Sequence, residues 1–481
     1  MIDIRPVLFV IGLFGITSGP LLMLCALVDL ASDNPDWQVF ALSAVITVGF
    51  GGLLSTATWT GSIRLTLRQG FLLTVLSWAV MSFIGAIPLY LSSLPISFAG
   101  AFFEAMSGFT TTGSTVIVGL DGMPPGLLLW RGLMQWVGGL GVIALGIVLL
   151  PFLRISGMQL FRLESSDVSE KATARLVVLI RQIGLLYLAI TMVGIFSLLA
   201  LGATPMDAVV HAFTAVSTGG FSTHDASAGF FDRPSQAALL VMMITGALTF
   251  PLLLLVFHGR PDVLWRDEQI RFYLLLIASI VSIIVLWRVA MTDADLVDAA
   301  WGTLFNVVSV ITTTGYASEN YLEWGPFPET AFLLFTLIGG CTGSTSGGIK
   351  PYRLLVLGRA LRGQLQTRIH PHRMTRVLYN GRIVDDEVVR SVFAFLGMLL
   401  AALVLFTAAV SACGVDPITA FSGVMQALAN VGPGVGPIIG PAGNFATMPE
   451  PALWILSAAM LLGRLEVVAV LVVISPAFWR L

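Results

Sequence analysis

Four short runs of small and hydroxyl-bearing residues, each reaching a glycine, recur along the chain at intervals of roughly a hundred residues. Backbone carbonyls and hydroxyls in such hairpins can replace the water shell of a monovalent cation. Glycine suits this task because it adopts positive φ without a Cβ clash. The pattern predicts a cation selectivity filter with these candidate ligands: Thr111, Thr112, Gly113, Ser217, Thr218, Gly219, Thr313, Thr314, Gly315, Asn430, Val431 and Gly432.

Each run follows a short apolar stretch of about half a membrane span. Helix-start residues open these stretches, as at Pro205 to Asp207, Asp295 to Asp298 and Asp416-Pro417, and less clearly near Ser97. A half-helix would direct the negative end of its dipole at the ion. The competing interpretation is that the glycines only allow close helix packing. Four related copies favour the filter, although Asn430 would offer an amide oxygen in place of a hydroxyl.

A second glycine-rich stretch, residues 339–348, interrupts an apolar span with five glycines in ten residues. A helix disfavours this composition, and irregular backbone at membrane depth lines water or is buried in protein. We therefore expect a gate beneath the filter. A phosphate-binding loop is excluded because Lys350 lies between Ile349 and Pro351. The candidate gate residues are Gly340, Thr342, Gly343, Ser344, Thr345, Ser346, Gly347, Gly348 and Arg464.

Arg464 lies in the middle of the last apolar span. An intramembrane charge needs a cavity or a partner. Glu466 is two residues away, so the two side chains would not share a face of one continuous helix. Two interpretations stay open: a structural arginine, or a pore-facing gate residue that hydrogen-bonds carbonyls of the glycine loop in a closed state.

Composition indicates an integral membrane protein. The chain has 481 residues, is 56% apolar and only 11% charged, with a mean hydropathy of +0.91. Three widely separated cysteines imply no disulfide framework. Apolar runs predict ten transmembrane helices, the eighth interrupted, near 7–30, 38–60, 70–92, 126–152, 177–201, 236–258, 270–291, 330–360, 391–413 and 452–476.

The expected fold is all-α and resembles a potassium channel, with four pseudo-repeats of helix, pore helix, filter hairpin and helix. Two extra helices precede the repeats, at 1–68. The predicted repeats are 69–154, 155–259, 260–389 with the interrupted helix and a basic linker, and 390–481.

Basic residues gather in alternate connections, at 64–68, 154–181, 260–271 and 350–390, whereas the hairpin connections are mainly acidic. The positive-inside rule then predicts cytoplasmic termini and outward-facing hairpins. The basic run at 368–373 suits anionic lipid head groups or a partner protein. His370 and His372 have no third metal ligand nearby in sequence.

Two other function classes are weighed against a pore. A coupled secondary transporter often has paired inverted repeats and two interrupted helices, whereas this sequence shows four same-direction repeats and one interrupted helix. An enzyme is disfavoured because the sequence contains no nucleophile constellation, paired carboxylates or metal cluster at a common site.

The four hairpins, the glycine loop and Gly463-Arg464-Leu465-Glu466 resemble the TrkH/KtrB superfamily of potassium-translocating subunits. The two leading helices make the chain similar to the Trk branch. The resemblance implies K+ as the transported ion, selected at the filter residues. In this family a serine in place of the first filter glycine implies a preference for sodium, and glycine at all four positions here, Gly113, Gly219, Gly315 and Gly432, resembles the potassium-selective pattern. It implies a homodimer in the bacterial inner membrane, with a cytosolic ring of Rossmann-type, TrkA-like subunits that bind ATP, ADP or NAD. No cofactor or nucleic acid is expected on this chain.

Overall fold

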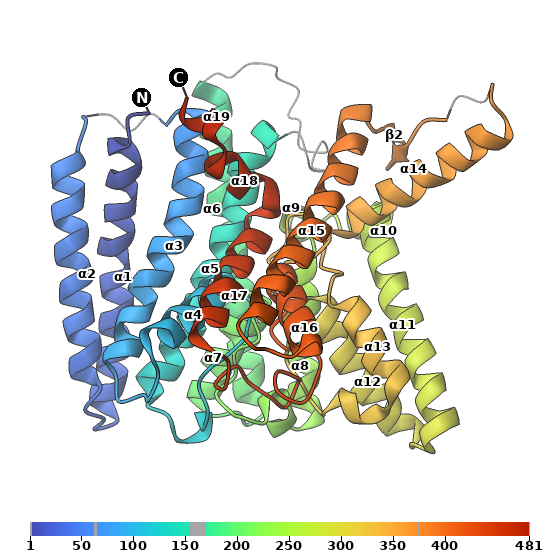
Figure 1. Cartoon of the computed structure of the whole chain (residues 1–481). Helices are drawn as coiled ribbons and strands as arrows, with labels where there is room; N and C mark the ends of the chain where they lie inside the picture. The colour runs from blue at the N-terminus through green and yellow to red at the C-terminus, as the bar shows by residue number, and fades with distance from the viewer. Residues whose placement is uncertain (1, 62–64, 154–169, 373–374, 481) are drawn as a thin grey trace.

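The computed structural model describes residues 2–61, 65–153, 170–372 and 375–480 (Figure 1). Over these ranges the chain is almost wholly helical, apart from a small hairpin of β1 (Leu378–Tyr379) and β2 (Arg382–Ile383). The predicted all-α membrane fold is confirmed. The gate, filter and pore-helix residues named above all lie within the described ranges, whereas most of the predicted connection at 154–181 does not.

The leading helices α1 (Arg5–Ala31) and α2 (Trp37–Thr58) form a close pair at one edge of the molecule (Figure 1). Small residues permit the approach, since an added Cβ at Gly51 would lie 2.6 Å from the carbonyl oxygen of Gly12. At its far end α1 places Asp29 against the next domain: Asp29 Oδ1 accepts a 2.6 Å hydrogen bond from Gly126 N. This carboxylate caps a helix of the first repeat from outside it.

Four repeats follow with one order: a long helix, a short helix, a hairpin and a returning helix. The long helices are α3 (Leu67–Leu91), α6 (Glu170–Ala200), α11 (Glu268–Thr292) and α15 (Asp386–Ala412). The short helices are α4 (Phe98–Phe109), α7 (Pro205–Val216), α12 (Leu296–Ile311) and α16 (Pro417–Ala429). The returning segments are α5 (Pro125–Leu153), α8 (Arg233–Ala247) with α9 (Phe250–Phe257), α13 (Pro326–Phe335) with α14 (Pro351–Ile369), and α17 (Glu450–Arg464) with α18 (Glu466–Ile474).

The short helices begin where the sequence predicts, because each has a side-chain cap. Ser97, Thr204, Asp295 and Asp416 accept hydrogen bonds from backbone N–H groups of the first turn. Each cap satisfies one or two of the backbone N–H groups that the start of a helix leaves without an intrahelical partner.

The predicted set of ten spans is only partly matched. In the described chain seven helices are long and apolar enough to cross a membrane, and α8 with α9 makes an eighth that bends by 108°. The sixth predicted span, 236–258, is therefore not one straight helix. Pro251 cannot continue the helical hydrogen-bond pattern, and Phe250 N instead donates to Gly343 O at 3.0 Å.

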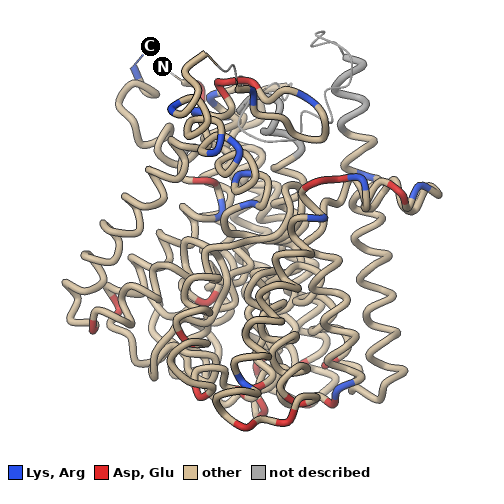
Figure 2. Tube along the Cα trace, turned by 90° about the vertical axis from the view of Figure 1, so that its right-hand side faces the viewer, with Lys and Arg blue, Asp and Glu red and all other residues tan. Residues whose placement is uncertain are grey.

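The tenth predicted span, 452–476, is also broken, because Glu466, two residues after Arg464, takes a φ of 53°. Small additional elements complete the described chain, namely η1 (Leu120–Gly122), η3 (Ser227–Phe230), η4 (Tyr321–Trp324), α10 (Asp262–Arg266) and α19 (Pro476–Trp479). Both termini lie at one end of the molecule (Figure 1). Figure 2 shows lysines and arginines gathered toward that end and mostly acidic residues at the opposite end.

Candidate functional site

The four hairpins share one backbone conformation. A left-handed residue opens each turn, at Thr111, Thr218, Thr313 and Asn430, with φ between 51° and 58°. Two residues later a glycine again has positive φ: Gly113 at 89°, Gly220 at 78°, Gly315 at 86° and Gly432 at 106°. The residue between them donates its N–H to the carbonyl five residues earlier, as from Thr112 to Ser107 at 2.8 Å and from Gly219 to Thr214 at 2.8 Å.

This comparison corrects the alignment of the second hairpin. Gly220, not Gly219, occupies the position of Gly113, Gly315 and Gly432. Gly219 matches Thr112, so the predicted set of Ser217, Thr218 and Gly219 lies one residue too early in the chain. Two adjacent glycines hide the offset in the sequence.

The hairpins close into a ring. A Cβ added at Gly113 would overlap Gly219 O, one at Gly220 would overlap Thr314 O, and one at Gly315 would overlap Val431 O. The circle closes at Gly432, where an added Cβ would lie 2.9 Å from Thr112 O. Each positive-φ glycine therefore faces a carbonyl oxygen of the next repeat, and the middle carbonyls of all four hairpins surround one axis.

The residues of the ring are deeply buried, and their side chains differ in the hydrogen bonds that they make. Hydroxyls of Thr112 and Thr314 bond within their own hairpins at 2.7 Å and 2.8 Å. Asn430 Nδ2 donates to Thr112 Oγ1 and to Met460 O, both at 3.0 Å. Thr111 Oγ1 and Asn430 Oδ1 are buried with no hydrogen-bond partner in the described part of the chain. Both oxygens belong to residues of the predicted filter set.

The glycine loop lies directly against the inner ends of hairpins two and three. Ser346 Oγ donates to Thr312 O at 2.7 Å, Gly347 N donates to Thr313 Oγ1 at 2.8 Å, and Thr218 Oγ1 donates to Thr345 Oγ1 at 3.2 Å. The loop therefore contacts two of the four hairpins.

The loop is more firmly held than its composition suggests. Cys341 N donates to Ala247 O at 2.8 Å and Thr345 N donates to Gly246 O at 3.1 Å, both at the bend between α8 and α9. Its two ends are joined by a bridge between Ile338 and Ile349. The carbonyl groups of Gly246 and Ala247, at the break in the sixth predicted span, therefore hold the loop in place.

Arg464 ends α17 beside this loop and is 6% exposed. Its three guanidinium nitrogens have no hydrogen-bond partner among the described residues. The predicted bonds from Arg464 to loop carbonyls are absent. Lys350 makes such bonds instead, donating from Nζ to Ser346 O and, at 3.3 Å, to Gly347 O.

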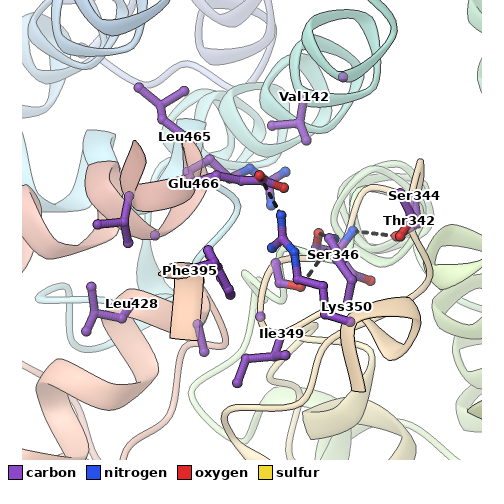
Figure 3. A pocket seen from close by; sticks show the side chains of 18 of the residues that line it. Val142, Thr342, Ser344, Ser346, Ile349, Lys350, Phe395, Leu428, Leu465 and Glu466 are labelled. Carbon is purple, nitrogen blue, oxygen red and sulfur yellow. Dashed lines mark hydrogen bonds and ion pairs between the residues drawn. The ribbon is translucent and has the colours of Figure 1, made fainter. Parts of the chain in front are cut away.

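Lys350 and Arg464 both line a cavity, which Figure 3 shows from close by with Lys350 labelled. It has a volume of about 110 Å³ and is lined by loop residues, by Arg464 and by apolar residues of several repeats. Glu466 is not a partner of Arg464, because it pairs with Arg353 at 2.6 Å across the cavity. Within the described residues, an unpaired guanidinium thus lies beside the glycine loop that contacts the hairpins.

Comparison with known proteins shows to which family the chain belongs. The family model described as "TrkH: Cation transport protein" matches residues 36–481. This chain belongs to the TrkH family. The Trk system potassium uptake protein TrkI of Halomonas elongata is 40% identical over 99% of this chain and 97% of the relative. The Trk system potassium uptake protein TrkH of Escherichia coli K12 is 33% identical over 99% of both chains. The crystal structure of the potassium transporter TrkH from Vibrio parahaemolyticus matches with a TM-score of 0.92 and 31% identity over 100% of both chains.

Outside the ring, this TrkH-family chain has an acidic cluster that the sequence reasoning missed. His224 Nδ1 bonds Asp121 Oδ1, and its Nε2 lies 3.2 Å from Asp207 Oδ1. The hydrogen bond with His224 lowers the pKa of the exposed Asp121 carboxyl, assisted by the backbone N–H of Asp225. The cluster joins the outer limbs of hairpins one and two.

Two buried glutamines that contact the hairpins are also absent from the predicted site residues. Gln135 Nε2 donates to Gly219 O at 2.7 Å, and Gln426 Oε1 accepts from Ser114 Oγ at 3.0 Å. Polar residues within apolar helices are the signal that could have revealed them, as for Arg131 on α5. The sequence analysis considers Lys350 as a phosphate-loop lysine and as one of the basic residues of 350–390, and predicts no contact between Lys350 and the glycine loop.

Proposed function

We propose that this chain is the potassium-translocating membrane subunit of a Trk-type uptake system. The closed ring of glycine hairpins carries the proposal, since four sets of inward oxygens around one axis suit a dehydrated monovalent cation. Glycine at Gly113, Gly220, Gly315 and Gly432 keeps side chains away from the neighbouring carbonyls and fits a preference for K+ over Na+. The names of the relatives, all potassium uptake proteins, support the choice of ion.

The inner barrier in this proposal consists of the glycine loop, Lys350 and Arg464. The loop touches three hairpin residues from below, and an unpaired guanidinium near a cation pathway repels the ion. Movement of the loop and of Arg464 would open the inner side.

The remaining parts of the proposal rest on membership of the TrkH family. The chain acts as a transporter and not as an enzyme, as a homodimer in the bacterial inner membrane, with its own repeats bounded near 69, 155, 260 and 390. Cytoplasmic termini are supported by the basic end in Figure 2. Nucleotide binds a cytosolic Rossmann-type partner, and K+ is the only ion assigned to this chain.

A planar-bilayer recording of the purified protein in a potassium gradient tests the mechanism. Stepwise unitary currents that reverse near the potassium equilibrium potential are expected, and replacing K+ with Na+ reduces them. Uptake that requires a proton or sodium gradient, with no unitary events, would instead support an ion-coupled symporter.

A further inference from the structure

A buried ion pair lies behind hairpins one and two. Arg131 Nε of α5 contacts Glu104 Oε1 of α4 at 2.9 Å, and the two side chains are 1% and 0% exposed. Desolvating two charges costs about as much as their attraction returns, so such a pair is weak support for stability by itself. Its geometry therefore points to a specific structural task.

Arg131 reaches both hairpins at once. Its Nη1 donates to Ser222 O at 2.9 Å, and its Nη2 donates to Thr115 Oγ1 at 3.2 Å. The guanidinium carbon also lies 4.2 Å from the ring centre of Phe221. Phe221 directly follows Gly220, and Thr115 is two residues after Gly113. One planar fork thus joins the chain segments that leave two neighbouring quarters of the ring.

Glu104 holds the other side of the same junction. Its Oε2 accepts from Val116 N at 2.9 Å, and its Oε1 accepts from Thr115 Oγ1 at 3.0 Å. The carbonyl of Thr115 accepts from Phe445 N at 2.8 Å, so the outer loop of the fourth repeat meets the same residue. Three of the four repeats are fixed relative to one another at this point.

We propose that Arg131 and Glu104 are positioning residues that set K+ against Na+ discrimination by fixing the separation of hairpins one and two. The inference rests on the proposed filter function. A carbonyl ring that can relax at one junction can contract around the smaller sodium ion, which reduces discrimination without closing the pathway. Neither side chain needs to touch the ion.

The third repeat offers a matched control. Arg288 is also buried, lies 3.9 Å from the ring centre of Trp324, and contacts Glu319 Oε1 at 3.2 Å. Its other bonds go to Ala299 O and Thr303 Oγ1. All of these partners belong to its own repeat, so Arg288 does not bridge two hairpins.

The test compares Arg131→Lys and Thr115→Val with Arg288→Lys in proteoliposomes. The lysine keeps the charge but loses the fork, and valine removes the hydroxyl that links Arg131 and Glu104. Initial K+ and Na+ fluxes per reconstituted molecule are measured, together with the thermal unfolding midpoint. Loss of one such hydrogen bond predicts that the K+/Na+ flux ratio falls by about two- to tenfold in the first two variants. The ratio in Arg288→Lys should equal that of the parent.

The outcomes separate this inference from the filter proposal. Gly113→Ser serves as the reference change within the ring. If Gly113→Ser lowers the ratio while Thr115→Val and every folded Arg131 variant leave it unchanged, the positioning role is wrong and the filter stands. If Gly113→Ser also leaves the ratio unchanged, the filter proposal fails with it. Equal falls in both fluxes and in the unfolding midpoint, at constant ratio, would reduce the pair to a structural role and overturn the inference.

Discussion

Gly220 has a positive φ, like the three other ring glycines, whereas Gly219 does not. Its φ of 78° disfavours any L side chain, and an added Cβ would overlap Thr314 O. At Gly219 an added Cβ would meet the side chain of Gln135, which can shift more easily than backbone. A side chain should therefore be tolerated better at Gly219 than at Gly220.

We expect Gly220→Ala to lower K+/Na+ discrimination more than Gly219→Ala does. A left-handed conformation costs a non-glycine residue about 1–2 kcal/mol, before the contact with Thr314 is counted. Permeability ratios of both variants, measured in vesicles at matched protein content, provide the comparison. A larger effect at Gly219 would contradict the structural alignment of the second hairpin.

Arg464 gives the second prediction at this scale. Two unit charges about 6 Å apart repel by roughly 3 kcal/mol at an effective dielectric of about 20. Such a barrier slows passage by about a hundredfold. Because the guanidinium makes no hydrogen bond among the described residues, its removal breaks none that the structure contains. Arg464→Ala should therefore raise resting potassium uptake, whereas Arg464→Lys should stay nearer the parent.

The measurement for Arg464 is potassium uptake corrected for the amount of protein in the membrane. A parallel Glu466→Gln variant controls for disturbance of the helix break, since Glu466 pairs with Arg353 and not with Arg464. An alanine variant that is well expressed and conducts no more than the parent would end the barrier hypothesis.

At the scale of elements, the contact between α1 and α5 joins the leading pair to the first repeat. Asp29→Ala removes the acceptor for Gly126 N at the start of α5, and loss of a helix cap costs about 1 kcal/mol. We expect a lower thermal unfolding midpoint in detergent with unchanged ion selectivity. Asp29→Asn keeps an acceptor oxygen and should restore the midpoint. Identical midpoints for the alanine variant and the parent would show that the contact contributes nothing.

The glycine loop supplies the next prediction. It contacts hairpin three through Ser346 and Gly347, and hairpin two through Thr345. Removal of residues within 340–348 should raise resting flux, because the proposed inner barrier would lose these contacts. Ser346→Ala, which removes only the bond to Thr312 O, should have a smaller effect. A shortened protein that folds, reaches the membrane and conducts no more than the parent would exclude the loop as a barrier.

Local chemistry explains which elements could be predicted from sequence. Caps at Thr204 and Asp416, and the repeated glycines, depend on nearby residues, so the short helices and hairpins were foreseen. The bend at Thr249 combines a local residue, Pro251, with a distant partner, the glycine loop, and the break at Glu466 lies at the ion pair with Arg353. Apolar composition cannot reveal such tertiary partners, and straight spans were therefore predicted in both places. Because these contacts are also tertiary, the sequence suggests Arg464 as the donor to the loop carbonyls, whereas the structure shows Lys350 in that role.

At the scale of the whole molecule, α14 connects the glycine loop with the end that carries both termini. Lys350 bonds the loop carbonyls, and α14 begins at the next residue, Pro351. Figure 1 shows α14 extending away from the helical body, near the end that carries both termini. A cytosolic partner that displaces α14 would thus move Lys350 and the loop together.

Two ion pairs of α14 oppose that displacement: the buried pair of Arg353 with Glu466, and a more exposed pair at Arg359. Arg359 Nη1 of α14 contacts Glu268 Oε2 of α11 at 2.6 Å and also donates to Leu378 O. The pair is partly exposed, so it contributes at most about 1 kcal/mol, which corresponds to a several-fold change in an open fraction. Arg359→Ala should therefore raise potassium uptake several-fold in cells that lack the cytosolic partner, and should reduce the further increase that the partner provides. Arg362→Ala, on the same helix, removes a guanidinium for which the described structure shows no contact and should behave like the parent. If both variants match the parent with and without the partner, then α14 does not transmit the signal, and the loop must be moved from another side.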